Sequence, residues 1–168
     1  MSSTEGTQDM ASIFDVSKKI LEEFPFGIST RKLQKLAYFS QGWHLALSKD
    51  NEPLFPEDFE AWRYGPVSRT LYNEHRKMYS INEDDLSKGN AAALSDAQQL
   101  IVNFVINKYG LLSGMELTDL THVAESPWSK IRRESGYGPD DPGDRTIPKD
   151  LIRAYFQERL HDLDQVFA

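Results

Sequence analysis

The sequence has 168 residues, no cysteine and a formal net charge of −7. Without cysteine the chain cannot form disulfides, thiolate-ligated zinc sites or iron–sulfur clusters, and it contains no apolar run of the roughly 20 residues that a membrane span needs. We therefore expect a cytoplasmic protein that does not insert into a membrane.

The charge balance also argues against nucleic-acid binding. The chain has 26 acidic residues against 19 lysines and arginines, and affinity for nucleic acid comes mainly from basic side chains that neutralise phosphates. Short basic groups do occur, such as Arg31-Lys32 with Lys35, and Arg132-Arg133. They are set among acidic residues and are typical of solvated helix faces. We expect no nucleic-acid binding in the absence of a partner protein.

The first half of the chain opens with two predicted helices. Residues 1–10 are polar and without periodicity, which predicts a flexible N-terminal tail, and residues 11–168 are predicted to form a single domain. Apolar residues recur at helical spacing over residues 11–24. A longer helix is predicted over residues 30–48, because Ser29 can cap its first turn and apolar residues line one stripe.

After the second predicted helix, the sequence pattern changes from helical to strand-like. Large and polar side chains alternate from Phe59 to Tyr64, as in a half-buried strand, so one short β element is predicted near residues 54–64. Gly65-Pro66 then turns the chain, and Pro66 can occupy the first position of a third helix that reaches about Met78.

The second half is predicted to be helical apart from its loops. Capping-box patterns begin helices over residues 95–109 and 113–124, Ser126-Pro127 begins a short helical segment, and a last helix starts at Pro148. The sequence therefore predicts a mainly α fold, a compact single-domain bundle of about six helices.

No motif for catalysis, metal binding or a cofactor is present. The histidines have neither a histidine partner at i,i+4 nor an HExxH frame; they are His44, His75, His122 and His161. Gly136–Gly143 contains several glycines but lacks the G-x-G-x-x-G pattern of a phosphate-binding loop, so a mobile turn is predicted there. We expect a protein that is not an enzyme and has no catalytic residue, metal or cofactor.

Large aromatic residues occur in predicted turns. Trp62 and Tyr64 stand next to Gly65-Pro66, and Trp128 follows Ser126-Pro127. Such residues can anchor a turn on the core through their large apolar area. They can also be exposed anchors of a protein interface, a role in which tryptophan, tyrosine and arginine are enriched. Both interpretations remain open from these residues alone.

Four segments in order resemble one known family. They are KLQKLAYFSQGWHLAL at Lys32–Leu47, PLFPEDFEAWRYGPV at Pro53–Val67, ELTDLTHVAESPW at Glu116–Trp128 and IPKDLIRAYF at Ile147–Phe156. Together they are similar to the Panacea domain, the SocA-like antitoxin family, which includes phage-associated proteins. The resemblance implies a mainly helical, non-catalytic domain that neutralises a protein toxin by direct binding, with the toxin encoded by an adjacent gene.

The resemblance also suggests where a partner would bind. The motif positions that carry over are Trp62, Arg63, Tyr64, Gly65, Pro66 and Trp128. The leading hypothesis is therefore a toxin-neutralising module that uses these residues. The alternative is an adaptor or inhibitor, carried by a phage or mobile element, that acts on a host protein.

Overall fold

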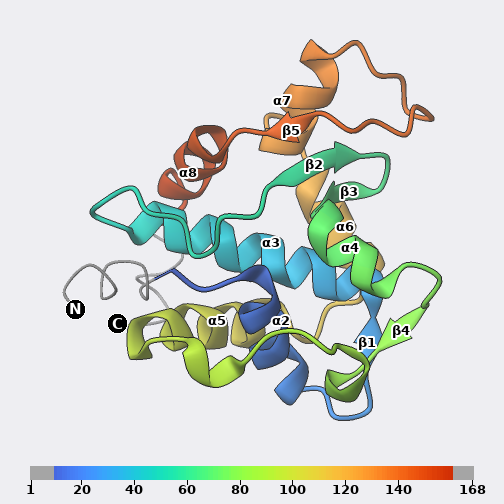
Figure 1. The fold of residues 1–168 in the computed structure, drawn as a ribbon. Coiled ribbons are helices and arrows are strands. Elements are labelled where there is room, and N and C mark those ends of the chain that lie inside the picture. The colour runs from blue at the N-terminus through green and yellow to red at the C-terminus, as the bar shows by residue number, and fades with distance from the viewer. Residues whose placement is uncertain (1–9, 161–168) are drawn as a thin grey trace.

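Helix α3 (Thr30–Leu47) runs through the centre of a computed structural model that describes residues 10–160 (Figure 1). Thirteen of its 18 residues are buried, so it is enclosed on nearly every side. The flexible tail predicted at residues 1–10 lies outside the described residues except for Met10. Several other elements pack directly against this helix.

The remaining helices surround α3. Helices α2 (Ile13–Glu22) and α5 (Asp96–Tyr109) lie below it in Figure 1, whereas α8 (Lys149–Gln157) lies above it and packs on its C-terminal half. Helix α6 (Gly114–Thr121) also packs on α3. The other helical elements are α4 (Arg69–His75), α7 (Pro127–Glu134) and the 3₁₀ helices η1 (Glu83–Asp85) and η2 (Ala91–Ala93).

Serine begins six of the seven α-helices found in residues 10–160. In each case the serine Oγ accepts a hydrogen bond from a backbone N–H in the first turn, which satisfies a donor that the helix itself leaves unpaired. These serines are Ser12, Ser29, Ser68, Ser95, Ser113 and Ser126. The capping boxes predicted at Ser95 and Ser113 are confirmed.

Two small antiparallel sheets complete the fold. Strand β2 (Phe59–Trp62) pairs with β3 (Gly65–Val67) on one edge and with β5 (Thr146–Ile147) on the other. Strands β1 (Ile28–Ser29) and β4 (Ser80–Ile81) form a separate two-stranded sheet.

The predicted mainly α fold is confirmed, but the β structure was underestimated. Only β2 lies in the region predicted for a β element. Strands β1, β4 and β5 have two residues each, which is too short for the alternating pattern that identifies a strand. Pro66 lies in β3 and not at the start of the third helix, which begins at Arg69.

Aromatic packing fills the core between α3, α5 and α8. The Trp43 ring contacts Phe104 and Phe156 edge to face, and its Nε1 donates to the Tyr109 hydroxyl at 3.0 Å. The chain after α3 is held by Gln41, which accepts from Leu54 N and donates to a neighbouring carbonyl. Within residues 10–160, no helix is both long and apolar enough to cross a membrane.

Candidate functional site

The β2–β3 hairpin presents the most exposed part of the sequence motif. Trp62 pairs with Gly65, so Arg63 and Tyr64 form a two-residue turn. The Tyr64 side chain is half exposed, and the guanidinium carbons of Arg31 and Arg63 lie 4.9 Å and 5.0 Å from its ring centre. These cation–π contacts orient the ring without burying it.

Gly65 permits this turn to lie close to α3. Its φ of +110° is a conformation that side chains disfavour. A Cβ at this position would also lie 2.7 Å from Cε of Lys35 and 3.0 Å from the Thr121 hydroxyl oxygen. Glycine is therefore required here for two separate reasons.

Side chains from α3 bind the backbone of the hairpin. Lys35 Nζ donates to the Pro66 carbonyl at 3.1 Å. Gln34 accepts from Ser68 N at 2.9 Å and donates to the Ser68 carbonyl at 3.1 Å, and its Nε2 lies 3.0 Å from the His75 ring. The side chains of these residues are buried; they are Gln34, Lys35, Ser68 and His75. The hairpin and the residue that follows it are therefore fixed to α3 by polar contacts away from water.

Trp128 holds the other side of the hairpin. Its Nε1 donates to the Trp62 carbonyl at 2.6 Å, and its ring stacks on His122 with centres 3.7 Å apart. Burial lowers the pKa of His122, so the neutral ring is favoured in this stack. Trp128 itself is half buried. It therefore contacts the backbone of the motif directly, as a turn anchor would.

Arg132 orders the loop that faces the hairpin. Its guanidinium donates to the Ala61 carbonyl at 2.8 Å and to three carbonyls of the 138–142 segment. Gly143 brings the loop close, because a Cβ there would lie 2.5 Å from Nη1 of Arg132. The segment Gly136–Gly143, predicted as a mobile turn, is thus bound through its backbone to a buried arginine.

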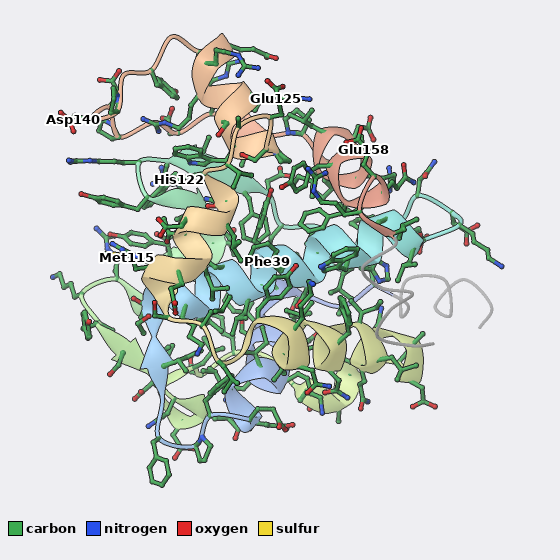
Figure 2. The ribbon with its side chains drawn as sticks, turned by 180° about the vertical axis from the view of Figure 1, so that it is seen from behind. Phe39, Met115, His122, Glu125, Asp140 and Glu158 are labelled. Carbon is green, nitrogen blue, oxygen red and sulfur yellow. The ribbon has the colours of Figure 1, made fainter. Side chains whose placement is uncertain are left out.

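A pocket of about 840 Å³ opens between the hairpin, α3, α4 and this loop. The loop side can be located by Asp140 in Figure 2, at the edge of the molecule farthest from α5. Basic and aromatic side chains line much of the pocket; they are Arg31, Lys35, Trp62, Arg63, Tyr64, Arg69, Tyr72 and Tyr137. Asp140, Asp141 and Asp144 also line the pocket, so four lysine or arginine side chains stand against three carboxylates.

The cations of the pocket differ in how they are neutralised. Arg63 pairs with Asp140 at 3.1 Å, and Arg69 pairs with Glu60 at 3.0 Å. Within residues 10–160 neither Arg31 nor Lys35 has a carboxylate partner. Burial, with a smaller contribution from Arg31, lowers the pKa of Lys35 to about 7. Arg31 therefore carries a positive charge that no carboxylate of residues 10–160 pairs with, whereas Lys35 is only partly charged near pH 7.

A second groove of about 650 Å³ adjoins the pocket and shares Thr30 and Arg31 with it. Its apolar lining includes Tyr79 and Met115, which are 87% and 64% exposed. Figure 2 shows Met115 and His122 at opposite ends of α6. The hairpin turn thus belongs to a wider face with two adjoining hollows.

The six motif residues proposed from sequence all lie together at this face. Arg63 and Tyr64 are exposed, Gly65 and Pro66 are buried beneath the turn, and Trp62 and Trp128 are half buried. Sequence reasoning missed Arg31 and Lys35 as part of the pocket. The prediction that Lys35 and Arg132 lie on solvated helix faces is wrong, because both are buried.

The described residues contain no cluster of three or more histidine and carboxylate groups suited to a metal ion. The polar groups at the face bind backbone atoms, form surface ion pairs or line the pocket.

Comparison with known proteins gives one family. Residues 33–129 match the family described as "Antitoxin SocA-like, Panacea domain". The chain is 29% identical over 119 residues to antitoxin SocA of Caulobacter vibrioides, an alignment that covers 65% of this chain and 62% of that protein. The chain thus spans somewhat less than two thirds of the length of the curated relative. No solved structure matches the chain.

Proposed function

Because the chain belongs to the SocA-like antitoxin family with a Panacea domain, we propose that it is a non-catalytic protein-binding module that neutralises a protein toxin by direct contact. The toxin is expected to be the product of an adjacent gene. The observation that carries this proposal is the family match over residues 33–129, which include the hairpin and most of α3. A relative named antitoxin SocA supports it.

The hairpin face is the proposed contact surface. Tyr64 and Arg63 project from its turn, and tyrosine and arginine are enriched among residues that dominate binding energy in interfaces. Trp62, Gly65, Pro66 and Trp128 act in this proposal by fixing the turn, through the contacts with α3 and α7 described above. The exposed Tyr79 and Met115 in the adjoining groove extend the apolar area available to a partner.

Co-expression with the adjacent gene tests the function. The adjacent product should inhibit growth when expressed alone, and co-expression of this chain should restore growth. The two proteins should then co-elute in size-exclusion chromatography. An inactive control is the same chain with Gly65→Val, which places a branched side chain against Lys35 and should not restore growth.

Three other results of the co-expression experiment would contradict the proposed function. If the adjacent product is toxic and this chain neither restores growth nor binds it, the toxin-neutralising function is wrong. If the adjacent product is harmless and a host protein co-purifies with this chain, the protein is instead an adaptor or inhibitor of that host protein. Restored growth without a complex would contradict neutralisation by direct contact.

A further inference from the structure

Two basic side chains that line the pocket beside the hairpin have no carboxylate partner among residues 10–160. Arg31 and Lys35 are one helical turn apart on α3 and both line the pocket. Arg31 contacts Tyr64 through its guanidinium. Lys35 Nζ makes one hydrogen bond among the described residues, to the Pro66 carbonyl, although an ammonium group has three donors. A buried lysine with donors to spare is a site for an anionic oxygen.

The opposite wall has the reverse charge. It consists of the loop that contains Asp140, Asp141 and Asp144, all of which line the pocket. The loop is held in place by Arg132, and Asp141 Oδ2 accepts from Gly138 N at 2.7 Å. Its carboxylates can accept hydrogen bonds from ligand hydroxyl or amino groups. A ligand that fits both walls carries an anionic group at one end and hydrogen-bond donors at the other.

The volume of the pocket and its aromatic lining indicate which class of ligand fits. A volume of about 840 Å³ is much larger than a single phosphate ion or one acidic side chain needs, and it falls within the range of pockets for small organic ligands. Trp62, Tyr64 and Tyr72 add aromatic surface to the lining of the pocket, which suits a flat ring. Phosphate, hydroxyl donors and a flat ring occur together in nucleotides.

We propose that this pocket binds a nucleotide, with its phosphates at Arg31 and Lys35 and its sugar and base between the aromatic lining residues and the 140–144 loop. Burial and the neighbouring Arg31 lower the pKa of Lys35 to about 7, so its charged ammonium is less stabilised here than in water, although the Pro66 carbonyl accepts a hydrogen bond from it. A bound phosphate would supply that stabilisation. This proposal does not rest on the toxin-neutralising function, because the ligand binds the chain alone.

Isothermal titration calorimetry of the purified chain tests the proposal. The probes are ATP, GTP, CTP and UTP, with inorganic phosphate and adenosine as fragments. At least one nucleotide should bind at a single site and at least tenfold more tightly than either fragment. Arg31→Gln should weaken that binding at least tenfold. The matched control Arg133→Gln removes an exposed arginine that does not line the pocket and should leave affinity unchanged.

Three results would overturn the proposal. They are no heat of binding with any of the four nucleotides, inorganic phosphate binding as tightly as the nucleotides, and equal nucleotide affinity in Arg31→Gln and the unsubstituted chain. Circular dichroism of each variant establishes that it is folded. Growth rescue on co-expression is measured separately, so failure of nucleotide binding and failure of the toxin-neutralising function remain distinguishable.

Discussion

The two sides of α3 are stabilised in different ways. Where α5 and α8 pack on α3, apolar rings pack directly, as Trp43 does against Phe104 and Phe156. On the side of the hairpin, a few polar side chains bind backbone carbonyls, as Lys35 and Arg132 do. The packing of apolar rings stabilises the fold by burying apolar surface between the helices. The polar contacts fix the shape of irregular segments that form the candidate site.

The largest loss of stability is expected from a substitution in the aromatic core around Trp43. Trp43→Ala removes a buried indole and leaves a cavity between α3, α5 and α8, which should lower the free energy of unfolding by about 3–5 kcal/mol. Urea unfolding followed by circular dichroism measures this. A loss below about 1 kcal/mol would mean that the aromatic cluster does not hold the helices together.

Lys35 is expected to make the stability of the fold depend on pH. Burial lowers its pKa from 10.5 to about 7, so between these values the unfolded chain holds a proton that the folded chain lacks. Stability should therefore rise with pH above 7, by up to about 1.4 kcal/mol per pH unit from this group. Below pH 7 both states are protonated and the full destabilisation remains. His75 and His122, whose pKa values burial lowers below 6.5, titrate below this window.

Lys35→Met isolates that contribution. The variant should be more stable than the unsubstituted chain at pH 7, and the difference should shrink as the pH approaches 9. Urea unfolding at pH 7, 8 and 9 provides the comparison. Parallel pH profiles for the two proteins would contradict a buried, uncompensated Lys35.

Arg132→Lys tests the polar anchoring of the loop. Lysine cannot reproduce the planar guanidinium that reaches four carbonyls. We expect a loss of about 2–3 kcal/mol in unfolding free energy and faster proteolysis within residues 136–144. The neighbouring exposed Arg133 provides the matched control Arg133→Lys, which should change stability by less than about 0.5 kcal/mol. Equal effects of the two substitutions would contradict the anchoring role.

A smaller effect is expected at Trp128. Trp128→Phe keeps an aromatic ring against His122 but removes the hydrogen bond to the Trp62 carbonyl. The expected loss is about 1 kcal/mol, measured by thermal or urea unfolding. If stability is unchanged and partner binding falls, Trp128 is an interface residue and not an anchor of the turn.

These two sides also differ in what the sequence could predict. Helical periodicity and serine caps identified the helices, because apolar spacing and capping chemistry are local. Lys35 and Arg132 were misassigned to solvated faces because a polar residue that binds a distant carbonyl has the same local pattern as a solvent-exposed one. Strand β5 was missed for a related reason, since its pairing with β2 is set by tertiary contacts. Trp62, Tyr64 and Trp128 were singled out as large aromatic residues in predicted turns, but only the family resemblance favoured a partner-binding role for them.

The central proposal is that the hairpin turn, and not the α5 side, contacts the partner. The direct test is the affinity of this chain for the adjacent gene product, measured by calorimetry for the unsubstituted chain, Tyr64→Ala and Leu100→Ala. Leu100 is a matched control because it is an exposed apolar residue on α5. Tyr64→Ala is predicted to weaken binding at least tenfold with stability unchanged, whereas Leu100→Ala is predicted to have no effect. Equal affinities for the two variants, or a loss only in Leu100→Ala, would contradict the account.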